Sequence, residues 1–185
     1  MQELLDKWGI KVDYNILLSM WNESHRSYHT QNHLLELIEQ INEHKSRLSQ
    51  RQYEKLMLCA LFHDIVYDPM RQDNEEKSAE FFINCCSEKN NSDLLEVKQM
   101  IFDTKTHEAK SDLSELFNHF DMKVVESDYE KLLEWEKGIK EEFEPFYGKE
   151  KYKFGRLHFL ESLLDKYPHN TDNLLKLIEY VKNTY

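Results

Sequence analysis

The sequence predicts an all-α protein, a single-domain helical bundle that spans residues 1–185. The first supporting observation is that glycine and proline are scarce, with 4 and 3 residues, where average usage would give about 13 and about 9. Sandwiches and barrels need many turn-forming residues, so this composition argues against them. The second observation is that apolar residues recur at helical spacing along nearly all of the chain, a pattern typical of helices that bury one face. We therefore expect about eight to ten helices.

The expected helices follow one another without a linker, an internal repeat or a low-complexity tract. Residues 56–66 are almost all apolar, which predicts a central, buried helix. This helix should end near the Asp68-Pro69 pair, because the residue before proline disfavours the α region. Asp73 or Asn74 is the expected N-cap of the next helix. Apolar spacing places the helices at residues 16–21, 34–41, 56–66, 79–83, 94–102, 129–143, 154–167 and 174–185.

The charge balance and the cysteines limit the partners and the location. The chain has 24 Lys+Arg against 35 Asp+Glu and a formal net charge of −11. Nonspecific nucleic-acid binders present a basic face, and anionic lipid attracts basic segments, so we expect neither nonspecific nucleic-acid binding nor membrane binding. No secretory signal or long apolar stretch is visible. Because Cys59, Cys85 and Cys86 are odd in number and two are adjacent, we expect reduced thiols and a cytoplasmic location.

Several of the nine histidines stand in positions that suit metal binding. His29 and His33 are four residues apart, which on a helix places both rings on one face. His63 and Asp64 are adjacent within the apolar stretch, where an ionised carboxylate needs a partner such as a metal ion. Each residue alone is more often structural, but together with the later Asp121 they indicate a metal site. Mixed imidazole and carboxylate ligands suit Zn, Mn, Fe or Co.

These residues belong to a longer series of short segments. The segments, in order, are residues 25–29 with His33, 60–69, 74–79, 101–107, Asp121, 135–143 and the Gly155-Arg156 pair. The series resembles the HD superfamily of metal-dependent phosphohydrolases, which is named after its adjacent His-Asp pair, and is most similar to its small, single-domain bacterial members. The resemblance covers most of the chain and implies an HD/phosphodiesterase-like helical bundle. It is specific for the family and says little about the substrate.

The resemblance implies a role for each matched residue. His33, His63, Asp64 and Asp121 would bind one or two divalent metal ions (Mn, Zn, Fe, Co or Mg), and Asp64 would bridge them if two are present. His29 would be the general acid that protonates the leaving oxygen. The implied reaction is hydrolysis of a phosphoester by a metal-activated water. The implied substrate is a nucleotide or another small phosphorylated molecule.

Four further residues are candidates for contact with the substrate. Arg26 and Arg156 could hold phosphate through a bidentate fork, and Lys105 could do so as a point charge. For each of these cations, an ordinary solvated surface position is an equally good interpretation. His107 resembles a position that serves a second metal or the substrate.

One departure from the family pattern keeps other interpretations open. Family members carry a second acidic residue near the last ligand and then a Leu-Gly pair, whereas here His119 replaces the acid and the glycine is missing. Asp128 is therefore the alternative to Asp121 as the last ligand. A lost ligand would leave a catalytically weak ligand-binding or scaffold protein of the same fold. A di-iron oxygenase of this fold would need more histidine ligands, which His107 and His119 could supply.

Overall fold

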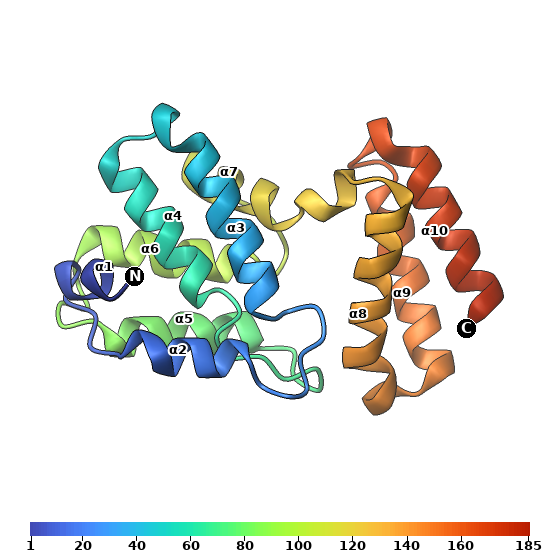
Figure 1. Cartoon of the computed structure of the whole chain (residues 1–185), viewed down its shortest axis with the longest axis horizontal. Coiled ribbons are helices and arrows are strands. Elements are labelled where there is room, and N and C mark those ends of the chain that lie inside the picture. The colour runs from blue at the N-terminus through green and yellow to red at the C-terminus, as the bar shows by residue number, and fades with distance from the viewer. The chain divides into compact units, whose positions relative to one another are not determined.

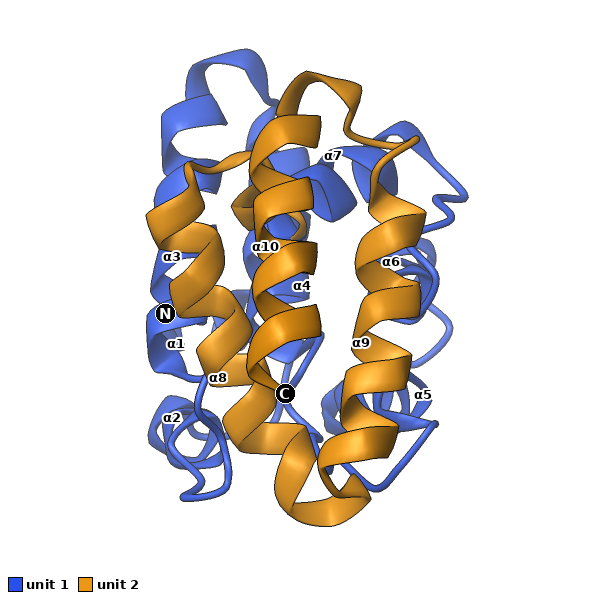
Figure 2. Ribbon diagram, turned by 90° about the vertical axis from the view of Figure 1, so that its right-hand side faces the viewer, with its two compact units in different colours: residues 1–121 blue, residues 122–185 orange.

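The computed structural model describes all 185 residues and confirms the all-α class. It contains ten α-helices, three short 3-10 helices and no β-strand. Packing of the backbone divides the chain into two compact units, Met1–Asp121 and Met122–Tyr185 (Figure 2). One domain over residues 1–185 stays a prediction. None of the helices combines the length and hydrophobicity that crossing a bilayer requires.

The first unit is built around α4 (Figure 1). Its elements are α1 (Gln2–Lys7), α2 (Tyr14–Trp21), α3 (Gln31–His44), η1 (Lys45–Arg47), α4 (Gln50–Phe62), α5 (Asn74–Cys85), α6 (Ser92–Asp103) and α7 (Asp112–Asp121). Helix α4 packs against α3, α5, α6 and α7. Every residue from Glu54 to Phe62 is buried, which confirms the expected central helix. Helices α1 and α7 were not among the helices expected from the sequence.

Capping and aromatic packing fix the position of α4. Ser49 and Gln52 form a reciprocal capping box at its N-terminus, so two backbone N–H groups that lack helical partners are satisfied there. At the other end, the indole Nε1 of Trp21 donates a hydrogen bond to the backbone oxygen of Leu61 at 3.0 Å. Trp21 and Phe62 are fully buried, and each such side chain contributes about 1.5–3 kcal/mol to stability. These contacts hold α2 against the C-terminal end of α4.

The central helix ends earlier than the sequence predicts. The expectation that it continues to the Asp68-Pro69 pair is wrong, because α4 ends at Phe62 and His63 is its C-cap residue. The His-Asp pair therefore lies at the end of the helix rather than inside it. The next two backbone carbonyls accept hydrogen bonds from the side chain of Arg26 instead of from helical N–H groups. This long-range partner replaces the hydrogen bonds that a longer helix would provide.

The second unit is a bundle of three long helices. Its elements are η2 (Lys123–Glu126), α8 (Tyr129–Tyr147), α9 (Lys149–Leu163), η3 (Pro168–Asn170) and α10 (Thr171–Thr184). Helices α8, α9 and α10 pack pairwise (Figure 2). The sequence predicts a turn at Pro145 and Gly148, but Pro145 lies inside the last turn of α8. Gly148 makes the turn with φ +75°, a conformation that costs glycine little.

Candidate metal centre

Two predicted site residues lie at the start of α3. Thr30 is the N-cap of this helix, and its side chain accepts a hydrogen bond from the backbone N–H of Asn32. His33 is therefore in the first turn and is buried, whereas His29 precedes the helix. The expectation that the two histidines share one helical face is wrong. Their rings nevertheless lie close to each other, with centroids 6.0 Å apart in an edge-on arrangement.

His33, His63 and Asp64 come together at the C-terminal end of α4. Each offers one ligand atom, and the three atoms lie within 4.8 Å of one another. The ring centroids of the two histidines are 5.5 Å apart, and Nε2 of His63 is 3.1 Å from Oδ2 of Asp64. The side chains of His33, His63 and Asp64 are 4%, 1% and 14% exposed. The two buried imidazoles and the largely buried carboxylate form a geometry that can hold a small cation.

Asp121, the last residue of α7, joins this group. Its Oδ1 accepts a hydrogen bond from Nε2 of His33 at 3.0 Å, and its Oδ2 accepts one from Nε2 of His107 at 3.1 Å. Nε2 of His63 lies 3.5 Å from the first of these oxygens. The alternative residue Asp128 is the N-cap of α8 and accepts a backbone hydrogen bond there. The carboxylate that contacts the predicted histidine ligands is thus that of Asp121.

One buried nitrogen in this cluster has no hydrogen bond. Nε2 of His63 is buried and unpartnered, although oxygens of Asp64 and Asp121 lie 3.1 and 3.5 Å away. The other ring nitrogen, Nδ1, lies 3.1 Å from the backbone oxygen of Ala60 and is placed to donate to it. When the ring is neutral, as metal binding requires, that contact favours the tautomer whose Nε2 lone pair faces the carboxylates. Buried polar atoms are rarely unpartnered, so this arrangement fits a cation held between the ring and the two carboxylates.

The charges of the cluster also favour a cation. Burial disfavours the charged imidazolium, but Asp64 and Asp121 outweigh this effect and raise the pKa of His63 to about 10. Burial likewise opposes ionisation of Asp64, yet the neighbouring His63 lowers its pKa below the usual range. The pKa of Asp121 falls well below its ordinary value in spite of burial, because His107 and His33 hydrogen-bond to the ionised form and the charge of His63 favours it. Two ionised carboxylates therefore face the buried nitrogen near neutral pH.

Arg26 has no donor left for a phosphate group. Its side chain is fully buried. Nε and Nη2 donate to the carboxylate of Glu23, Nη1 donates to the backbone oxygens of His29 and Asp64, and Nη2 also donates to that of Ile65. A guanidinium carries five N–H donors, and these five bonds use all of them. This geometry argues against the predicted phosphate contact.

The other two predicted cations also have partners. Lys105 in the first unit donates through Nζ to the backbone oxygen of Gln72 and to the carboxylate of Glu76. Arg156 in the second unit donates through Nε to the buried carboxylate of Glu136, and its Nη2 is buried without a hydrogen bond. Both cations are thus neutralised by a glutamate within their own unit. A role for either in holding phosphate stays a prediction.

His107 is held in an unusual backbone conformation. It has φ +54° and is the only residue other than glycine with a positive φ, which costs on the order of 1–3 kcal/mol. The buried carboxylate of Asp103 accepts hydrogen bonds from the backbone N–H of Lys110 and the hydroxyl of Ser114, so it closes the loop that carries His107. The sequence analysis missed Asp103. The available signal was an acidic residue at the end of an apolar segment, residues 94–102.

His119 is exposed, unlike the buried residues of the candidate metal centre. Its side chain is exposed on α7, with its ring centroid 6.0 Å from that of Phe120. The di-iron alternative could draw on His107 and His119 as additional ligands, and the exposure of His119 argues against this residue as one of them.

Comparison with protein-family models gives no match, and comparisons with curated proteins and with solved structures give no significant match. The family resemblance therefore stays a prediction, and the chemistry of this site rests on its geometry.

Proposed function

We propose that this chain hydrolyses a phosphoester with the help of a divalent metal ion held by His33, His63, Asp64 and Asp121. The observation that carries the proposal is the buried Nε2 of His63, which has no hydrogen bond and faces two carboxylates. Imidazole nitrogens and carboxylate oxygens are the ligands that Mn, Zn, Fe and Co accept. The substrate would be a nucleotide or another small phosphorylated molecule, and the location cytoplasmic, since reduced thiols suit that compartment.

Different side chains would have different roles at this metal centre. When bound, a divalent ion supplies a Lewis acid and an acidified water. Asp64 and Asp121 would balance its charge, and His107 would orient Asp121 through the second carboxylate oxygen. The rings of Trp21 and Phe117 lie 5.5 and 5.3 Å from that of His63. These apolar rings limit the access of bulk water to the buried side of the cluster.

His29 would supply the proton that the leaving group needs. It is half-buried and lies beside His33, with its ring centroid 4.5 Å from that of Tyr67. A water oxygen would attack phosphorus and lose a proton to solvent while the bond to the leaving oxygen breaks. His29 would transfer its proton to that oxygen and regain one from solvent. A positioned general acid of this kind is worth about 10²–10⁴-fold in rate. We expect His29→Ala to lower kcat by this factor while the metal content stays unchanged, with His158→Ala as an exposed control.

Metal content tests the proposal most directly. We would measure it by inductively coupled plasma mass spectrometry on wild type and on a His63→Ala/Asp64→Ala variant, both purified without a metal-affinity column. A His158→Ala/Asp165→Ala variant removes the same two residue types from exposed positions. We expect near-stoichiometric metal in wild type and the control, and loss in the first variant. Absence of metal from wild type, even after incubation with Mn, Zn, Fe and Co, would overturn the proposal.

A further inference from the structure

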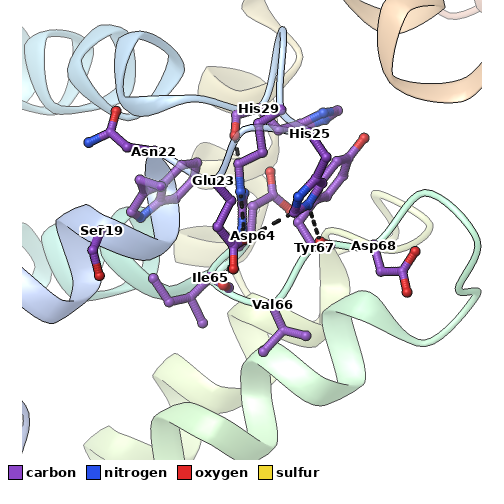
Figure 3. Close-up of polar contacts among 12 residues, drawn as sticks. Ser19, Asn22, Glu23, His25, His29, Asp64, Ile65, Val66, Tyr67 and Asp68 are labelled. Atoms are coloured by element: carbon purple, nitrogen blue, oxygen red, sulfur yellow. Dashed lines mark hydrogen bonds and ion pairs between the residues drawn. The ribbon is translucent and has the colours of Figure 1, made fainter.

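Side chains from distant parts of the sequence hold the loop that follows the His-Asp pair. This loop, residues 64–68, lies beside the segment that carries His25 and His29 (Figure 3). It contains no helix or strand. Four side chains form hydrogen bonds with its backbone. Arg26 donates to the backbone oxygens of Asp64 and Ile65, and His25 donates to that of Tyr67. Ser78 bonds to both the N–H and the C=O of Val66, and Asn74 bonds to the same two groups of Asp68. The loop conformation therefore depends on these four side chains.

Arg26 makes the most contacts of the four. Its guanidinium lies 5.4 Å from the ring centroid of Trp21 and 5.1 Å from that of Tyr67, so aromatic rings limit its movement. Glu23 accepts from Nε and Nη2 at 3.2 and 3.1 Å. The remaining donors point to backbone oxygens at 2.9–3.2 Å. The guanidinium is thus held by the aromatic rings near it and by hydrogen bonds from all of its N–H groups.

One nitrogen of this group joins the two segments that matter for the proposed reaction. Nη1 of Arg26 donates to the backbone oxygen of His29 at 3.1 Å and to that of Asp64 at 2.9 Å. The first segment carries the proposed proton donor and the second carries a proposed metal ligand. A planar fork with several fixed donors can span such a pair of carbonyls, whereas the compact ammonium of lysine cannot reproduce this geometry.

We propose that Arg26 is a positioning residue, which fixes the backbone of Asp64 relative to that of His29 and does not itself bind phosphate. His25, Asn74 and Ser78 extend the same support along the loop. This accounts for segments 25–29 and 74–79, whose residues other than His29 have no place in the proposed chemistry. The expected effect of Arg26 on metal binding and catalysis rests on the proposed function. The hydrogen bonds by which Arg26 holds the loop do not depend on it.

Two measurements test the inference separately. The first is NMR detection of scalar couplings across hydrogen bonds, from ¹⁵N-labelled guanidinium groups to backbone carbonyl carbons. We expect couplings from Arg26 to the carbonyls of His29, Asp64 and Ile65 in wild type, with or without metal. Absence of all three couplings would overturn the inference. This result is independent of metal binding and of enzymatic activity.

The second measurement compares the Mn²⁺ affinity of Arg26→Lys with that of a matched control. Arg51→Lys is that control, because Arg51 also lies over an indole ring, that of Trp8, and pairs with a carboxylate, that of Asp93, but contacts no carbonyl of the loop. Loss of a partner that orients a ligand lowers metal affinity about 10–100-fold. We expect that decrease in Arg26→Lys and no change in Arg51→Lys. An unchanged affinity in folded Arg26→Lys would overturn the positioning role.

Two further readouts keep the test decisive. If Arg26→Lys does not fold, Glu23→Gln loosens the guanidinium while leaving its carbonyl bonds available, and we expect a smaller loss of affinity. With bis(p-nitrophenyl) phosphate as substrate, a positioning role lowers kcat of Arg26→Lys and leaves KM unchanged, whereas a phosphate contact would raise KM and overturn the inference. A wild type that binds no Mn²⁺ would refute the proposed function, while the NMR couplings would still decide whether Arg26 holds the loop.

Discussion

Metal affinity should rise steeply with pH, because His63 must lose a proton to become a ligand. In the metal-free protein the carboxylates raise the pKa of His63 to about 10, and an imidazole binds metal only in its neutral form. Below that pH, each binding event releases one proton, so the association constant should increase about tenfold per pH unit. Between about pH 7 and about pH 8.5 the increase is about 30-fold, whereas an unperturbed histidine with a pKa near about 6.5 would give almost none.

The assay is titration with Mn²⁺, with the free ion measured by electron paramagnetic resonance at constant ionic strength. A plot of the logarithm of the association constant against pH should have a slope near about +1 in wild type. Asp121→Asn removes one of the negative charges that raise the pKa of His63. Both the Mn²⁺ affinity and the slope of this plot should therefore be lower in Asp121→Asn than in wild type. A slope of zero in wild type would refute the reasoning, because it would mean that His63 is already neutral in the metal-free site.

The same proton has a consequence for the metal-free fold. The folded-state pKa of His63 is raised to about 10, above the value near about 6.5 expected in the unfolded chain. The stability that this protonation contributes is therefore fully present below the unfolded pKa and is lost as the pH rises through the folded pKa. Chemical denaturation at increasing pH, with a chelator present, should show that decline.

Three further changes have expected outcomes. Ser78→Ala should lower the free energy of unfolding by about 1–2 kcal/mol in urea denaturation, because both backbone groups of Val66 lose their side-chain partner. Asp128→Ala should cost about 0.5–2 kcal/mol by the same assay through loss of the α8 cap, without loss of metal. His119→Ala should leave metal content unchanged by mass spectrometry, because this side chain is exposed.

Each of these outcomes has a clear opposite. An unchanged unfolding midpoint in Ser78→Ala would show that water replaces the hydroxyl at no cost. Loss of metal in Asp128→Ala would restore the alternative last ligand. Loss of metal in His119→Ala would favour the di-iron alternative, in which this histidine could be an additional ligand.

The helical class was predictable because the spacing of apolar residues is a local property of the sequence. Helix α7 was missed even though its apolar residues, Leu113, Leu116, Phe117 and Phe120, follow that spacing. The end of α4 was not predictable in the same way. It is set by Arg26, whose partner Asp64 lies 38 residues along the chain, and no local pattern reports a contact at that separation.

The residues that cluster at the site were predictable from their type and from their neighbours in the sequence. The hydrogen-bond partners of the predicted phosphate-binding cations were not. His33, His63, Asp64 and Asp121 combine ionisable groups with apolar neighbours, which is visible in the sequence. Whether an arginine keeps N–H donors for a ligand depends on which backbone carbonyls accept hydrogen bonds from it in the folded chain. The choice between Asp121 and Asp128 had one usable signal, since an aspartate directly before a helical segment is a typical N-cap.

The way in which loop 64–68 is held affects how such a site could diverge. Its hydrogen bonds join main-chain atoms, which every residue type except proline possesses in full, to the side chains of Arg26, His25, Asn74 and Ser78. Side chains at residues 65–68, beyond the proposed ligand Asp64, can therefore be exchanged without loss of these bonds, provided that the packing tolerates the new shape. Replacing any of these four supporting side chains, in contrast, removes hydrogen bonds to the loop. New substrate preferences would arise by substitution in the loop, while the residues beneath it stay constant.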